Sequence, residues 1–190
     1  MEQNSSGGKR DDILRATLRL IKSHGFHGTP MSLIAQEAQV GAGTIYRYFK
    51  SKEDLIQQLY REIRLAADKA MLENYQAEVP VRERFMRVWK NLAKYFILNP
   101  DHLGFLDQFD LSPFPYQPDE EHQQLLQEID QFLDYAREQQ FMKDLSNTCL
   151  YALIFAPLRA LCRLHHTGEM ELSEDLMQLN AAACWDAVRR

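Results

Sequence analysis

The sequence lacks the motifs that mark most enzymes and metalloproteins. It contains no glycine-rich phosphate loop, no G-x-S-x-G nucleophile motif and no cysteine pairs at zinc-binding spacing. Its six histidines follow no metal-ligating pattern, and the adjacent His165 and His166 would face different directions on a helix. We therefore expect no metal site, no cofactor and no catalytic residues. An enzyme that uses an apolar cavity, with a His or Asp as acid or base, is only a remote alternative.

Cysteine is scarce, and no apolar run is long enough to span a membrane. The three cysteines lie in apolar, helical stretches without paired spacing, which favours reduced and packed thiols: Cys149, Cys162 and Cys184. The longest apolar region, Leu150 to Leu164, includes two arginines and is shorter than the roughly 20 residues that a membrane span needs. The N-terminus is polar and contains Gly and Ser, unlike a signal peptide. We expect a cytoplasmic protein that does not enter a membrane.

Positive charge is in the minority, with a formal net charge of −5, but it is unevenly distributed. Residues 1–64 hold ten Lys or Arg and seven Asp or Glu, whereas residues 65–190 hold twelve and twenty. DNA would repel the acidic C-terminal part, so only the N-terminal part is expected to contact a nucleic acid.

No segment alternates apolar and polar residues for long enough to form a sheet, so the fold class is all-α. Apolar spacing, capping residues and prolines predict about nine helices. They cover residues 11–24, a short helix from Thr29 to Ala38, a second short helix after Gly41, residues 51–75, the segment between Pro80 and Asn99, and residues 101–110, 119–140, 144–166 and 173–188. Residues 113–118 contain three prolines and cannot be helical.

The two short helices before residue 50 form a helix-turn-helix. Thr29 is the predicted N-cap of the first of them, with Pro30 at its first helical position. The turn lies at Gln39–Gly41, where Gly41 can take the turn or N-cap conformation. The second helix of such a motif is able to enter the major groove of DNA.

The second short helix carries side chains that suit DNA. Ile45 and Phe49 are four residues apart and form the natural core pair, so Tyr46 and Arg47 point elsewhere. Arg can reach a guanine edge, and small residues let the backbone approach a phosphate. Lys52 stands in the first turn of the next helix, where the helix dipole disfavours a cation unless a phosphate lies nearby. The predicted DNA-binding residues are Ser32, Ala42, Gly43, Thr44, Tyr46, Arg47, Tyr48 and Lys52. The alternative is that the tyrosines are core residues and Lys52 a solvated lysine.

Residues 11–57 resemble the DNA-binding domain of the TetR (tetracycline-repressor-like) family of transcription regulators. The resemblance rests on Gly25-Phe26, Thr29, Ile34-Ala35, Ala38, Val40, Gly43-Thr44-Ile45-Tyr46, Tyr48-Phe49 and Ser51-Lys52-Glu53-Asp54-Leu55. The family often has Ser and then Lys where this chain has Gly41 and Ala42. The polar residues 1–9 are expected to be disordered. The resemblance implies a helix-turn-helix domain over 10–57 and a ligand-binding and dimerisation domain over 58–190.

The C-terminal part contains a cluster of aromatic residues at helical spacing. Such residues usually form the core, but the family resemblance implies an inducer pocket in this half of the chain. The predicted ligand-binding residues are Trp89, Tyr95, Phe96, Phe105, Phe109, Phe114 and Tyr116. They are rich in apolar surface, so we expect a small hydrophobic effector, an aromatic or acyl compound.

The helix over residues 144–166 is apolar on more than one face and must be covered on several sides. The last helix can cover one side and a symmetry mate another, which predicts a homodimer through Leu153, Ala156, Ala160, Leu164, Leu179 and Ala183. We therefore expect a ligand-responsive repressor that binds a palindromic double-stranded DNA operator as a homodimer and is released by its effector. The alternative is a DNA-binding regulator of the same fold that has no small-molecule ligand or acts as an activator.

Overall fold

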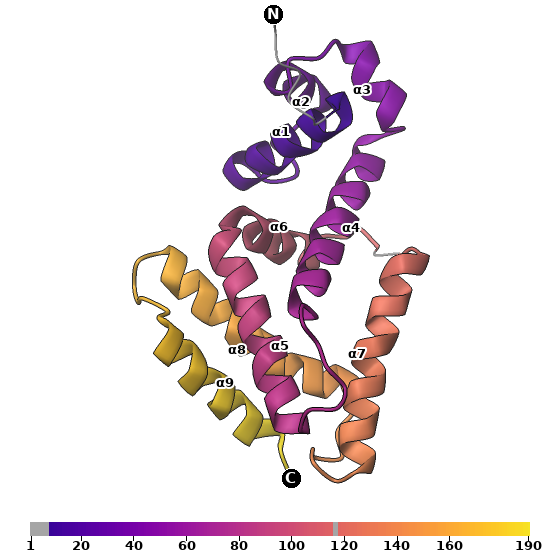
Figure 1. Cartoon of the computed structure of the whole chain (residues 1–190). Coiled ribbons are helices and arrows are strands. Elements are labelled where there is room, and N and C mark those ends of the chain that lie inside the picture. The colour runs from indigo at the N-terminus through magenta and orange to yellow at the C-terminus, as the bar shows by residue number, and fades with distance from the viewer. Residues whose placement is uncertain (1–7, 116–117) are drawn as a thin grey trace, which may run out of the picture. The chain divides into compact units, whose positions relative to one another are not determined.

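Figure 1 shows the computed structural model of the chain, which describes residues 8–115 and 118–190. These residues form nine α-helices, and the predicted all-α fold with about nine helices is confirmed. The helices are α1 (Lys9–His24), α2 (Met31–Glu37), α3 (Ala42–Tyr48), α4 (Lys52–Met71), α5 (Val81–Leu98), α6 (Pro100–Asp110), α7 (Glu120–Glu138), α8 (Asn147–His166) and α9 (Glu174–Val188). A single isolated bridge joins Met142 and Arg189 in the described part of the chain.

Local sequence signals explain most helix ends. α1 ends at Gly25, whose φ of 66° is a left-handed conformation that glycine adopts without steric cost. Asp119, Ser146 and Ser173 cap α7, α8 and α9, because the side chain of each accepts a hydrogen bond from the amide three residues later. α8 therefore begins after Ser146, slightly later than the predicted start at residue 144.

Two helix ends differ from the prediction. Thr29 is not an N-cap, because it is buried and its hydroxyl donates to the Gly25 carbonyl at 2.8 Å, and Pro30 takes the N-cap position. α4 ends at Met71 rather than near Tyr75. The reason is that Asn74 has a φ of 56°, which a right-handed helix cannot contain.

The described chain forms two compact units. The first unit contains Met1–Arg64 and Asp101–Gln117, and the second contains Leu65–Pro100 and Pro118–Arg190. Residues 58–64 and 101–115 thus belong with the N-terminal segment, because Phe26 contacts the ring of Phe105 at a centroid distance of 5.8 Å and Tyr60 stacks on Phe109 at 3.8 Å. The compact units do not follow the predicted boundary at residue 57, and the functional division there stays a prediction. Helix α1 already includes Lys9, whereas residues 1–7 of the predicted disordered segment lie outside the described residues.

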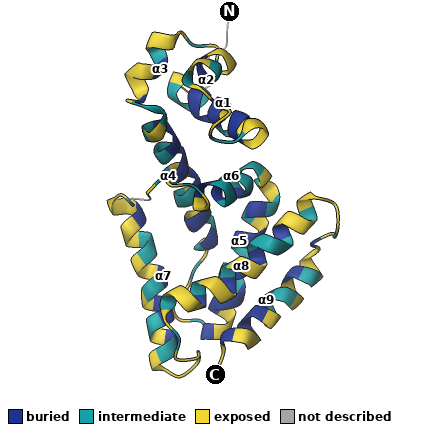
Figure 2. Ribbon diagram, turned by 180° about the vertical axis from the view of Figure 1, so that it is seen from behind, coloured by how far each residue is buried: buried dark blue, intermediate teal, exposed yellow. Residues whose placement is uncertain are grey.

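Each unit has its own apolar core, drawn dark blue in Figure 2. In the first unit α1, α2 and α3 pack on one another around Ile13, Ile21, Ile34, Ile45 and Phe49. In the second unit α5, α8 and α9 pack pairwise, α7 packs on α8, and Trp89 and Phe96 are fully buried. Among the described residues no helix has the combined length and apolar character needed to cross a bilayer.

The three cysteines are free thiols in two different environments. Cys162 and Cys184 are buried as predicted, and burial raises the pKa of the Cys162 thiol to about 12. The prediction of a packed thiol is wrong for Cys149, which is exposed in the first turn of α8. An apolar sequence neighbourhood did not reveal which side of α8 faces the core.

Candidate DNA interface

In the helix-turn-helix of the first unit, α3 is anchored by two buried side chains and exposes its other side. Ile45 and Phe49 are almost completely buried, which confirms them as the core pair of this segment. Tyr46 and Tyr48 are 57% and 42% exposed, so neither tyrosine is a core aromatic. α3 has only seven residues and depends on this anchoring, because such a short helix is unstable alone.

Tight backbone turns set the position of α3. Gln39 takes a φ of 54° in the turn after α2, and Gly41 serves as the N-cap of α3, one of the two roles predicted for it. Before α2, a Cβ on Gly28 would lie 2.4 Å from the carbonyl oxygen of His24. Only glycine fits this close approach between the end of α1 and the start of α2.

The predicted DNA-binding residues of α3 lie together on its exposed side. Ala42, Gly43, Tyr46 and Arg47 share one face of the helix and are exposed, as the yellow surface of α3 in Figure 2 shows. Thr44 is half-buried beside this face. Ser32, the predicted DNA-binding residue on α2, is also exposed. Contact of these residues with DNA stays a prediction.

Lys52 has a partner within the protein. Its ammonium donates a hydrogen bond to the carbonyl oxygen of Phe26, and the side chain is half-buried. The helix dipole disfavours a cation in the first turn of α4, and this hydrogen bond offsets that cost. A phosphate is therefore not needed to explain the position of Lys52. An ammonium has three N–H groups, so this bond leaves two donors for a phosphate, and a phosphate contact of Lys52 stays a prediction.

The junction between α3 and α4 is fixed by a reciprocal cap. The Asp54 amide donates to Ser51 Oγ at 3.1 Å, and the Lys50 amide donates to Asp54 Oδ2 at 2.8 Å. Partial burial acts to raise the pKa of the Asp54 carboxyl, but hydrogen bonds from Gln58 and Lys50 and nearby cations bring it below its ordinary value. Lys50 itself is exposed and basic, and it was not in the predicted set. Its position two residues after the end of α3 was the available signal.

The predicted effector-binding aromatics are divided between the two units. Phe105 and Phe109 are buried in the first unit, where Phe26 makes edge contacts with the rings of Phe105 and Phe114 at 5.8 and 5.6 Å. The second unit holds the other described members of the set, Trp89, Tyr95 and Phe96. Tyr116 lies outside the described residues. The seven residues therefore do not form a single cluster in either unit, and their contact with an effector stays a prediction.

The second unit contains a buried polar pair that sequence analysis missed. His122 Nε2 of α7 lies 2.6 Å from Asp68 Oδ2 of α4, and both side chains are almost completely buried. Burial, with a smaller contribution from the Asp68 carboxylate, raises the pKa of the Tyr95 hydroxyl to about 12. The unit contains one further buried charged side chain, Arg84 of α5, among its described residues. Asp68 directly follows the apolar Ala66-Ala67, which was the only sequence signal for its burial.

The predicted dimer residues lie at the surface of the second unit. Leu153, Ala156 and Leu164 of α8 and Leu179 and Ala183 of α9 are exposed, and Ala160 is half-buried. The exposed fractions of Leu153, Leu164 and Leu179 are 41%, 36% and 66%, and the role of these residues in a dimer stays a prediction.

Comparison with known proteins identifies the family. Residues 80–189, more than half of the chain, match the family model for the tetracyclin repressor-like C-terminal domain, and residues 13–59 match the model for bacterial regulatory proteins of the tetR family. The chain belongs to the TetR family. TetR-family proteins are DNA-binding transcription regulators rather than enzymes, and the predicted non-enzymatic role is confirmed.

Two curated relatives and a solved structure illustrate this membership. An HTH-type transcriptional regulator of Haemophilus influenzae is 32% identical over 103 residues, which are 54% of this TetR-family chain and 55% of that protein. The fatty acid metabolism regulator protein of Bacillus subtilis is 34% identical over 101 residues, 52% of this chain and 50% of that protein. The chain thus spans about half the length of the curated relatives it matches. The crystal structure of a tetR family transcription regulator from Shewanella sp. PV-4 has the same fold, with a TM-score of 0.85, 22% identity and coverage of 97% of this chain and 100% of that one.

Proposed function

We propose that this TetR-family regulator is a repressor that binds a palindromic operator as a homodimer and leaves it when a small hydrophobic molecule binds. The observation that carries the DNA contact is the exposed face of α3. Tyr46 and Arg47 extend from a helix whose opposite side is held by the buried Ile45 and Phe49. Rigid presentation of an Arg and a Tyr suits the reading of base edges and phosphates in a major groove.

The dimer follows from the length of the recognition helix and from the exposed surface of α8 and α9. A seven-residue helix covers one half-site, and two-fold pairing supplies the second half-site of a palindrome. The apolar side chains exposed on α8 and α9 support pairing through these helices: Leu153, Ala156, Leu164, Leu179 and Ala183.

The effector is proposed to bind in the second unit among α4, α5 and α7. Ligand sites combine apolar walls with a few polar groups, and this unit contains the buried pair Asp68 and His122 and a ring contact between Tyr95 and Phe96. The name of the Bacillus subtilis relative, a fatty acid metabolism regulator, supports an acyl compound as the effector. Binding would lower DNA affinity if the effector favours the state that does not fit the operator.

Arg47→Ala tests the DNA contact. The operator would be selected by the wild-type protein from random duplex DNA, and binding would be measured by fluorescence anisotropy at fixed salt. We expect a loss of about 1–3 kcal/mol of specific binding free energy and a relaxed preference at one base position in each half-site.

Arg15→Ala is the matched control, because Arg15 is an exposed arginine of the same unit that lies on α1 and pairs with Asp12. It should bind the operator like the wild type. Equal binding by the Arg47→Ala variant, with helical content intact, would contradict the docking of α3.

The effector is tested by thermal shift and DNA release with a series of acyl and aromatic compounds. A true effector should raise the melting temperature, since it binds only the folded state, and weaken operator binding about 5- to 150-fold. A compound that stabilises the protein and strengthens operator binding would indicate a ligand-dependent activator. If no compound in the series stabilises the protein, a regulator without a hydrophobic ligand becomes the better description.

A further inference from the structure

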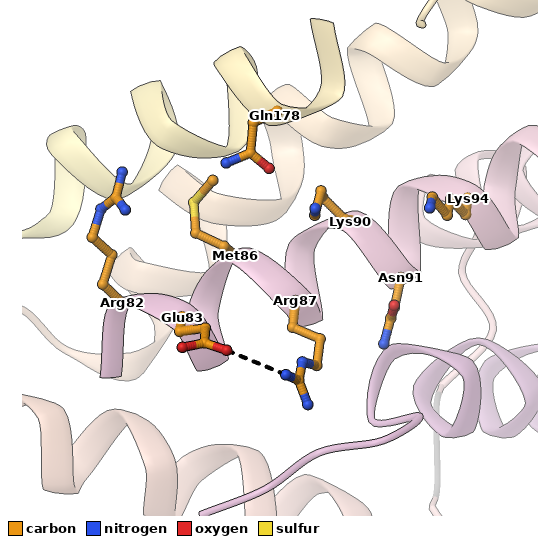
Figure 3. Close-up of a pocket in the computed structure, with 8 residues that line it drawn as sticks. All are labelled: Arg82, Glu83, Met86, Arg87, Lys90, Asn91, Lys94 and Gln178. Carbon is orange, nitrogen blue, oxygen red and sulfur yellow. Dashed lines mark hydrogen bonds and ion pairs between the residues drawn. The ribbon is translucent and has the colours of Figure 1, made fainter. Parts of the chain in front are cut away.

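The second unit has a surface groove along α5 that the proposed function does not use. Figure 3 shows its lining, in which Gln178 of α9 faces the α5 side chains Met86 and Lys90. The groove has a volume of about 370 Å³. Its lining residues are Arg82, Glu83, Met86, Arg87, Lys90, Asn91, Lys94 and Gln178.

Positive charge exceeds negative charge in this groove. Lys94 and Lys90 share one carboxylate, that of Glu174, at 3.0 and 3.9 Å. Arg87 pairs with Glu83 at 3.4 Å. Arg82 forms no hydrogen bond or ion pair with the part of the chain that the structure describes. Four cations therefore face two carboxylates, although residues 65–190 as a whole are strongly acidic.

Two of the α5 side chains that line the groove hold the turn that directly follows α4, and Asn91 also donates to the carbonyl of Met71, the last residue of α4, at 3.3 Å. Arg87 Nη1 donates to the Asn74 carbonyl at 2.6 Å, and Asn91 Nδ2 donates to the Glu73 carbonyl at 2.9 Å. In Figure 3 both side chains extend from α5 toward this connection. Helix α4 begins at Lys52, shortly after the recognition helix ends at Tyr48. An event that moves Arg87 thus releases the turn at the C-terminal end of the helix that follows α3.

We propose that the groove binds a small molecule with more than one phosphate group, and that this ligand weakens DNA binding by drawing Arg87 away from the Asn74 carbonyl. Two excess positive charges suit a polyanion, and the arginine fork matches phosphate geometry. The cations from Arg82 to Lys94 extend over roughly 18 Å of helix, longer than a single phosphate group. The volume lies within the range of roughly 300–1,000 Å³ found for small-molecule sites. Binding here does not depend on the hydrophobic effector proposed above.

Calorimetric titration of the full chain with inorganic tripolyphosphate at low salt tests the site. We expect saturable binding with one site per chain. The double variant Arg82→Gln/Lys90→Gln should weaken the affinity about tenfold or more, because each lost charge-assisted contact has about this effect.

The control double variant Lys69→Gln/Arg189→Gln removes the same two residue types from the same unit, outside the groove. It should change the affinity less than about threefold, the effect of general charge alone. Equal weakening by the two double variants would show non-specific attraction and overturn the proposal. Lys94→Gln should also weaken tripolyphosphate binding. Because Lys94 is exposed, this variant should fold even if the double variant Arg82→Gln/Lys90→Gln does not. Binding of hexaglutamate but not of tripolyphosphate would assign the groove to an acidic protein segment and overturn the phosphate ligand.

Hydrogen exchange tests the coupling to α4 without requiring an operator. Tripolyphosphate should speed the exchange of the Leu72, Glu73 and Tyr75 amides, which are hydrogen-bonded within this connection. Arg87→Gln should do the same without ligand. On the selected operator, tripolyphosphate should weaken binding about fivefold or more. Binding of tripolyphosphate with unchanged exchange and unchanged operator affinity would overturn the regulatory role, whereas a missing response to acyl compounds would bear only on the effector proposed earlier.

Discussion

Replacing Phe109 by alanine is expected to lower the free energy of unfolding by about 3–5 kcal/mol. Phe109 is only 4% exposed, and its ring stacks on Tyr60 at a centroid distance of 3.8 Å in the first unit. Removing the ring would leave a cavity between α4 and α6, which cannot collapse without moving Tyr60 and Phe105. Urea denaturation followed by circular dichroism measures the effect.

The control is Leu111→Ala, two residues along the chain at a position that is 91% exposed. It should change the free energy of unfolding by no more than about 0.5 kcal/mol. The same pair of variants separates packing from effector binding. If Phe109→Ala keeps the stability of the wild type but loses the response to acyl compounds, Phe109 lines the effector site and is not a packing residue.

If the proposed homodimer forms, Ala156→Glu is expected to convert it to a monomer and to remove operator binding at concentrations where the wild type saturates. Ala156 is exposed on α8 between Leu153 and Ala160. An unpaired carboxylate buried in an apolar interface costs several kcal/mol, and a symmetric dimer would contain two. A monomer has only one α3 and can occupy only one half-site. Light scattering at micromolar concentration measures the dimer, and fluorescence anisotropy measures the DNA binding.

Ala77→Glu is the matched control, because Ala77 is exposed in the same unit but lies outside the predicted interface. This variant should remain dimeric and bind DNA. A monomeric wild-type protein, or a dimeric Ala156→Glu variant with normal operator binding, would contradict an interface formed by α8 and α9.

Local signals in the sequence determined the helices and the form of the helix-turn-helix. Caps such as Asp119 and Ser173, and the terminating Gly25, act within a few residues of where they stand. The four-residue spacing of Ile45 and Phe49 settles which side of α3 is buried, because a helix repeats every 3.6 residues. These features could be predicted since each depends only on neighbours along the chain.

Features that join distant residues could be decided only by the tertiary structure. Helical spacing is the same for a core phenylalanine as for a pocket phenylalanine, so it did not divide Phe105 and Phe109 from Trp89 and Phe96. The partner of Lys52 is the carbonyl of Phe26, 26 residues earlier in the chain.

The buried polar pair and the charged groove are also formed by residues that are far apart in the sequence. Asp68 and His122 are 54 residues apart, and nothing local pairs them. The spacing of Lys90 and Lys94 also fits a helix face that is exposed to solvent. That face becomes one wall of a groove because α9 packs beside it, with Gln178 in the lining and Glu174 paired with Lys94. The sequence by itself determined that this chain is a helical protein with an N-terminal helix-turn-helix, because those properties are local. Which side chains meet inside each unit was decided by packing between helices far apart in the sequence.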